Sequence, residues 1–160
     1  MDISSKASGF SFIELVIVVA IIGILSVVAI LNWPSNTVLL DAQTAVVAHD
    51  IRYAQSLSMA KNQRFRFVRI SSSSYQIQDS SGTPQYLPAG GTTVNLGSGI
   101  SFGSFTNLPN NLIAFDTEGI PYVTTGSPGT KLTSTAIVRV VSGGVTRTIS
   151  ISPDTGDVSL

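Results

Sequence analysis

The N-terminal part of the chain contains one long apolar run. No charged residue lies between positions 15 and 33. As a helix this run would extend about 28 Å, because each residue adds about 1.5 Å. That length suits the roughly 30 Å hydrocarbon core of a bilayer. The pattern predicts a membrane-spanning helix with Trp33 near an interface and a break at Pro34, which lacks a backbone donor.

A second helix is predicted over residues 37–61, where apolar positions recur at steps of three or four. We expect it to be amphipathic and to lie on a sheet. His49, the only histidine, is expected to pack in this helix rather than to bind a metal, since no second histidine could share one. The stripe expected to face the core comprises Leu39, Ala42, Val46, His49, Tyr53, Leu57 and Ala60.

From residue 64 onward the period changes to two, which is typical of strands. In residues 64–70, Phe65 and Phe67 should face the core and Arg64 and Arg66 the solvent. Ser142-Gly143-Gly144 predicts a hairpin turn with positive φ, and residues 153–156 a second turn. Further strands are expected at residues 74–78, 93–96, 100–102, 111–116, 136–141, 145–151 and 158–160. The inward residues expected from alternation are Phe65, Phe67, Ile113, Phe115, Ile149 and Ile151.

The overall prediction is an α+β fold, with a long N-terminal helix packed on antiparallel sheet. Its first half would span the membrane, and its second half would be amphipathic. Nine basic residues balance nine acidic ones, and this balance is a weak argument against a nucleic-acid-binding protein. The absence of cysteine excludes disulfides and thiolate metal sites.

Glu14, at the edge of the apolar run, helps to distinguish three interpretations of the N-terminus. Lys6, the apolar run and Val27-Val28-Ala29 could form an ordinary secretory signal, or the run could be a plain membrane anchor. Neither needs a carboxylate, which costs roughly 2.5–3.5 kcal/mol at the centre of a membrane helix and less near its end. The segment Gly9-Phe10-Ser11-Phe12-Ile13-Glu14 instead closely resembles the processing site of type IV prepilins.

This resemblance implies cleavage between Gly9 and Phe10 by prepilin peptidase and N-methylation of Phe10. Glu14, the fifth residue counted from Phe10, would then pair with the Phe10 amine of a neighbouring subunit during assembly. The implied organisation is a leader (1–9), a transmembrane and filament-core helix (10–33), an amphipathic helix half (34–62) and an exported β-rich domain (63–160). The protein would be a single-pass protein of the bacterial inner membrane with a periplasmic domain, before it enters a pilus or pseudopilus.

The rest of the chain is similar, though less specifically, to the GspH/FimT type of minor pilin and pseudopilin. The similarity lies in residues 50–60, 113–119 and 147–151. It implies a subunit of a type IV pilus or a type II secretion filament, whose partners are other pilin subunits, inner-membrane lipid and the peptidase. The less favoured alternative is a FimT-like pilin that captures DNA. The arginines that serve there have no counterpart in residues 155–160, which contain Asp157 instead.

Few residues suggest chemistry, and we expect no enzyme activity, no catalytic residue, no cofactor and no metal. Asp116 and Glu118 are interpreted as a polar turn, while Asp154 and Asp157 supply too few oxygens for calcium. The basic cluster of Arg64, Arg66 and Arg69, close to aromatic residues, could contact nucleic acid or another subunit. A solvated strand face or a subunit contact is the favoured interpretation.

Overall fold

The computed structural model describes residues 11–31, 36–126 and 128–160. The chain divides into two units, Met1–Ser35 and Asn36–Leu160. The first unit contains helix α1 (Phe12–Leu31), whose side chains are exposed from Phe12 through Ser26. The predicted break at Pro34 and the interfacial position of Trp33 lie outside the described residues.

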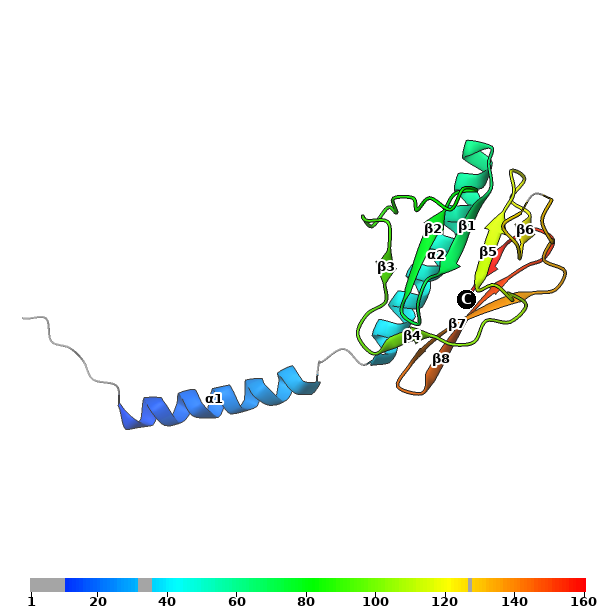
Figure 1. Cartoon of the computed structure of the whole chain (residues 1–160). Coiled ribbons are helices and arrows are strands. Elements are labelled where there is room, and N and C mark those ends of the chain that lie inside the picture. Colours follow the sequence, from blue (N-terminus) through cyan, green and yellow to red (C-terminus); the bar gives the residue numbers. More distant parts are fainter. Residues whose placement is uncertain (1–10, 32–35, 127) are drawn as a thin grey trace, which may run out of the picture. The chain divides into compact units, whose positions relative to one another are not determined.

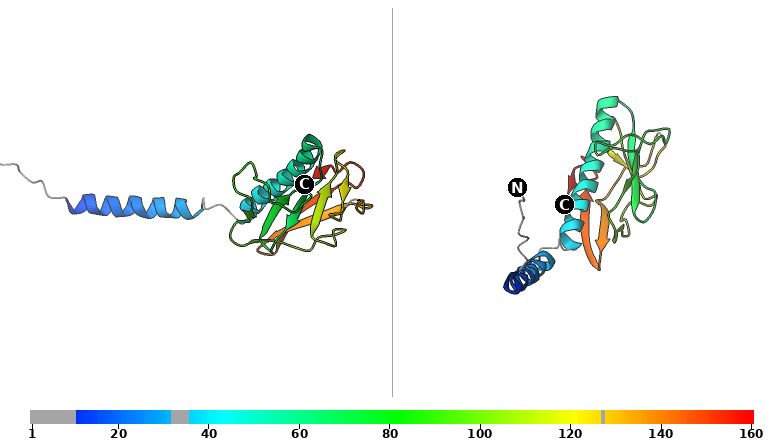
Figure 2. Two further views of the ribbon diagram at one scale, coloured as in Figure 1. Left: turned by 45° about the horizontal axis from the view of Figure 1, so that its top comes forward. Right: turned by 90° about the vertical axis from the view of Figure 1, so that its left-hand side faces the viewer.

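The second unit contains helix α2 (Asn36–Lys61), which runs along two antiparallel sheets (Figures 1 and 2). The first sheet has the order β3-β2-β1-β5-β6 and the second the order β4-β7-β8-β9. The first comprises β1 (Phe65–Arg69), β2 (Ser74–Gln78), β3 (Val94–Asn95), β5 (Leu112–Phe115) and β6 (Pro121–Tyr122). The second comprises β4 (Ile100–Phe102), β7 (Ala136–Ser142), β8 (Val145–Ile151) and β9 (Val158–Ser159). The predicted α+β class is confirmed.

The strand register supports the period-two prediction. Phe65 lies opposite Phe115 and Phe67 opposite Ile113 in the β1–β5 pair, so the four side chains share one face. All six residues expected to point inward are fully buried. The β7–β8 hairpin turns through Gly143 and Gly144 with φ of 56° and 82°, as predicted. The two-residue strand β6, which begins with a proline, was not predicted.

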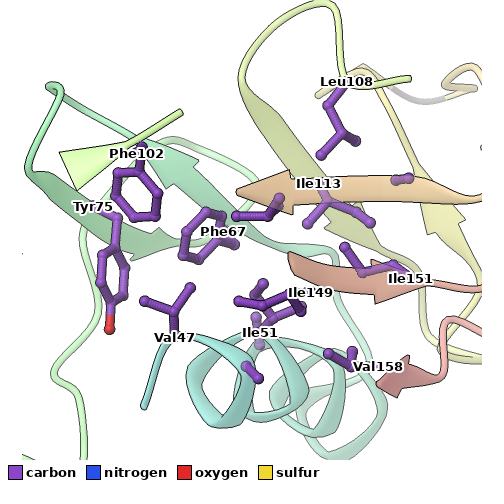
Figure 3. Close-up of a cluster of buried hydrophobic side chains, with 14 of the residues drawn as sticks. Val47, Ile51, Phe67, Tyr75, Phe102, Leu108, Ile113, Ile149, Ile151 and Val158 are labelled. Atoms are coloured by element: carbon purple, nitrogen blue, oxygen red, sulfur yellow. The ribbon is translucent and has the colours of Figure 1, made fainter. Parts of the chain in front are cut away.

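The core lies between α2 and the two sheets. Val47 and Ile51 of α2 point toward Phe67 of one sheet and Ile149 of the other (Figure 3). Tyr75 and Phe102 extend the cluster, and the Phe67 and Tyr75 ring centroids are 4.9 Å apart. This arrangement fixes α2 on the domain, so that residues of α2 can be assigned to defined positions against the strands.

The predicted core-facing stripe of α2 is wrong by about one residue. Leu39 and Val46 are exposed, Tyr53 and Leu57 are only half-buried, and the His49 side chain, expected to be packed, is 67% exposed. The buried face is instead made of Leu40, Thr44, Val47, Ala48, Asp50, Ile51, Ala54 and Ser58. Because three of these residues are polar, the hydropathy pattern does not identify this face as the buried one. The Thr44 and Ser58 hydroxyls are accommodated because they donate to the carbonyls of Leu40 and Ala54.

Candidate functional site

The N-terminal end of α1 holds Glu14 in the first helical turn. The Ser11 carbonyl accepts hydrogen bonds from the amides of Glu14 and Leu15, at 3.0 and 3.2 Å. A carboxylate in this turn is favoured by the partial positive charge of the helix N-terminus. Glu14 is exposed, as are the neighbouring Phe12 and Ile13. The helix therefore presents one carboxylate at the start of an otherwise apolar surface.

The predicted cleavage and methylation residues, Gly9 and Phe10, lie outside the described residues. Cleavage there, methylation of Phe10 and pairing with Glu14 thus stay predictions. Over the part of the chain that the structure describes, no helix is long and apolar enough to be a membrane span.

Each arginine of the predicted basic cluster has a partner within its own chain. Arg64 donates to the Gly126 carbonyl and stacks on Tyr122, with its guanidinium carbon 4.1 Å from the ring centroid. Arg66 donates to the Gln78 side chain at 3.1 Å. Arg69 donates to the carbonyls of Ser71 and Gly103, at 3.1 and 3.0 Å, and lies near two phenylalanine rings. The three side chains connect strands and loops, an arrangement that favours a structural role over nucleic-acid binding.

Replacing Arg69 with alanine should lower the free energy of unfolding by about 1–2 kcal/mol, because two hydrogen bonds and the cation–π contacts with two phenylalanine rings are lost. Urea unfolding of the full chain measures this change. Lys131→Ala is the control, since Lys131 is exposed and its ammonium lies 5.9 Å from the Tyr122 centroid. The control should change stability by less than about 0.5 kcal/mol. Equal effects of the two variants would contradict the structural role.

Gln55 of α2 holds two distant turns together, and the sequence pattern did not reveal it. Its side-chain amide donates to the carbonyls of Gly119 and Thr155, each at 2.9 Å. One turn further back, Arg52 donates to the Val158 carbonyl at 2.5 Å. These contacts fix the β5–β6 turn and the C-terminal turn against α2.

Two aspartates, Asp116 of a predicted turn and Asp79 of a loop after β2, hold the backbone around them. Asp116 accepts hydrogen bonds from the amides of Glu118 and Ile120, at 3.0 and 2.9 Å, which supports the interpretation of Asp116 and Glu118 as a polar turn. The Asp79 carboxylate accepts hydrogen bonds from the Ser81 hydroxyl and from the amides of Ser81 and Thr83. These hydrogen bonds lower the pKa of Asp79, and the Ser81 hydroxyl has the largest effect. Among the described residues, no three histidine, aspartate or glutamate side chains gather as a metal site.

The sequence matches two family patterns that together cover most of the chain. The prokaryotic N-terminal methylation motif matches residues 4–30. The family described as type II transport protein GspH matches residues 43–155. No curated protein matches the chain in sequence.

Two solved structures share the fold. Both are crystal forms of the type IV minor pilin FimU of Pseudomonas aeruginosa, with TM-scores of 0.54 and 0.52 and identities of 13% and 12%. The alignments cover 76% and 74% of this chain, and 87% and 90% of the FimU chains. At this identity they establish a pilin-like fold only. Because one family pattern accounts for most of the folded domain and the other for the N-terminal helix, the chain belongs to the GspH family of pilin-like proteins.

Proposed function

We propose that this protein is a minor pilin or pseudopilin, made as a prepilin and assembled into a filament through its N-terminal helix. The observation that carries the proposal is the methylation motif at residues 4–30, joined to a GspH domain at residues 43–155. Within that motif, Gly9 would precede the cleaved bond and Phe10 would become the methylated N-terminus. Prepilin peptidase and other pilin subunits are the partners that this processing requires.

The apolar helix would hold the processed subunit in the bacterial inner membrane before assembly. The uncharged run at residues 15–33 supports this anchoring, because its length suits the bilayer. Lys6 would stay on the cytoplasmic side by the positive-inside tendency. The domain that follows would then be periplasmic and would join a type IV pilus or a type II secretion filament.

The folded domain would act as a structural subunit and not as an enzyme. Its arginines serve contacts within the chain rather than a substrate site. Backbone carbonyls accept from four of them: Val158 from Arg52, Gly126 from Arg64, Ser71 and Gly103 from Arg69, and Ser104 from Arg139. Side-chain oxygens accept from the other two: Gln78 from Arg66 and Asp41 from Arg147. Since these guanidinium groups are already engaged, assembly with other subunits is favoured over DNA capture.

The intact mass of the membrane-bound protein tests the processing step. We expect a mature chain of residues 10–160 that carries one extra methyl group on the Phe10 nitrogen. Gly9→Val should leave the full-length precursor, because a bulky side chain would obstruct the peptidase site. Gly23→Val, which lies within α1 and has open space around it, is the matched control and should be processed. A mature chain that begins after Ala29 would instead establish an ordinary secretory signal.

A further inference from the structure

Asp50 is a buried carboxylate that contacts a tyrosine and a histidine. It is 4% exposed. One of its oxygens accepts the Tyr75 hydroxyl at 2.6 Å, and the other lies 3.4 Å from His49 Nδ1. Burial, and next the hydrogen bond to Asp50, raise the pKa of Tyr75 well above its usual value, so Tyr75 remains a neutral donor. Among the described residues, no lysine or arginine lies within ion-pair distance of Asp50.

A surface groove is lined in part by Asp50. It has a volume of about 510 Å³, and its lining is mainly aliphatic. Ala45, Val46, His49 and Asp50 of α2 form one side, and Pro88 and Ala89 of the β2–β3 loop form the other. The loop is held in place by buried Leu87, whose amide donates to the Gly91 carbonyl at 3.0 Å and whose carbonyl accepts from the Gly90 amide at 2.9 Å. The groove is thus part of the folded domain.

We propose that this groove receives a lysine or arginine side chain from an adjacent subunit, with the cationic group paired to Asp50. The aliphatic stem of that side chain would lie against Val46, Pro88 and Ala89, as long basic side chains commonly lie on apolar surface. A buried carboxylate is costly until it is paired, so the pairing would favour association. The inference rests on the proposed filament function, which supplies the adjacent subunit.

Other occupants fit the groove less well. An uncharged apolar side chain would remove more water from Asp50 without compensating its charge, and an acidic group would be repelled. A metal ion would find one carboxylate and one imidazole, whereas zinc sites use at least three protein ligands and calcium sites six or more oxygens. Charge and shape together therefore select a basic side chain.

The groove can be tested without the unknown partner. The probe is Nα-acetyl-lysine methylamide, titrated into the isotope-labelled full chain in detergent and followed by the amide signals of Ala45, Val46 and Ala89. Nα-acetyl-norleucine methylamide, which has an aliphatic side chain but no charge, is the matched probe. We expect the lysine probe to bind at least about tenfold more tightly, as a charge-assisted hydrogen bond implies.

Two variants complete the test. Asp50→Asn keeps an acceptor for the Tyr75 hydroxyl but removes the charge, and it should abolish the preference for lysine. Ala89→Trp should block the probe by filling the groove while Asp50 stays intact. Asp41→Asn, which changes an exposed carboxylate of the same helix, should bind the lysine probe as the unaltered chain does.

Equal binding of both probes, no binding of the lysine probe, or a lysine preference that survives in Asp50→Asn would overturn the inference. Because small probes report on the groove alone, these outcomes leave the processing at Phe10 and the filament function untouched.

Discussion

Replacing Gly156 with alanine is expected to lower the free energy of unfolding by about 3–4 kcal/mol, through a left-handed backbone penalty and displaced hydrogen bonds. Gly156 has φ of +68°, a conformation that side chains with a Cβ disfavour. A Cβ there would lie 2.6 Å from the Gly119 carbonyl oxygen, 2.7 Å from Gln55 Nε2 and 3.0 Å from Phe115 Cε1. The added Cβ would thus displace the side-chain amide of Gln55, which joins the two turns to α2.

Gly143→Ala separates the two causes of this loss. Gly143 also has a positive φ, +56°, but a Cβ there would meet nothing within 4 Å. Its substitution should cost only about 1 kcal/mol, the backbone penalty alone. Urea unfolding of both full-length variants gives the comparison. If the two variants lose equal stability, then the clash of the added Cβ at position 156 with Gln55 and Gly119 does not contribute measurably to the loss.

Strand positions and their inward faces were largely predictable from the sequence. Alternation is a local signal, and Phe65, Phe67, Ile149 and Ile151 each follow it, so their burial is predictable from the amino-acid pattern alone. The two-glycine hairpin turn was predictable for the same reason, because its backbone needs positive φ. How the strands divide between two sheets was not predicted, since that depends on pairings between residues distant in sequence.

The orientation of α2 illustrates the limit of hydropathy patterns. Leu39 and Leu40 are adjacent and equally apolar, and the pattern favoured the stripe of Leu39, which the structure leaves exposed. The true stripe contains Asp50, which is compatible with burial because the Tyr75 hydroxyl bonds to it. That bond joins residues in different elements, so no local window of sequence could disclose it.

The contacts that fix the C-terminal turn were unpredictable for a similar reason. Gln55 and Arg52 are polar residues of a helix, and polarity alone favours a position that faces the solvent. Two of their acceptors, the carbonyls of Thr155 and Val158, lie about a hundred residues away in the sequence. Every residue has a backbone carbonyl, so the sequence does not indicate which one accepts the hydrogen bond. In contrast, the N-terminal segment was interpretable at once, because Gly9, Phe10 and Glu14 form a short contiguous motif with its own chemistry.

Replacing Glu14 with alanine should leave processing and membrane insertion intact but reduce incorporation into the filament by at least about a hundredfold. The reason is that removing one partner of a buried ion pair leaves the other charge unpaired, at a cost of ~3–5 kcal/mol. Without the carboxylate, α1 becomes more apolar, so insertion should improve if it changes. The methylated Phe10 amine of the neighbouring subunit would then enter an apolar environment unpaired.

Quantifying the variant in the membrane fraction and in sheared or purified filaments measures both steps in one preparation. Glu118→Ala, which removes an exposed carboxylate of the folded domain, is the matched control and should assemble normally. Glu14→Asp keeps the charge on a shorter side chain, so it should assemble better than Glu14→Ala. Normal assembly of Glu14→Ala would exclude the pairing role, whereas loss from the membrane fraction would mean that Glu14 acts earlier, in insertion or processing. Because charge is the property at issue, Glu14→Gln should fail as Glu14→Ala does, even though its side chain keeps the length and shape of glutamate.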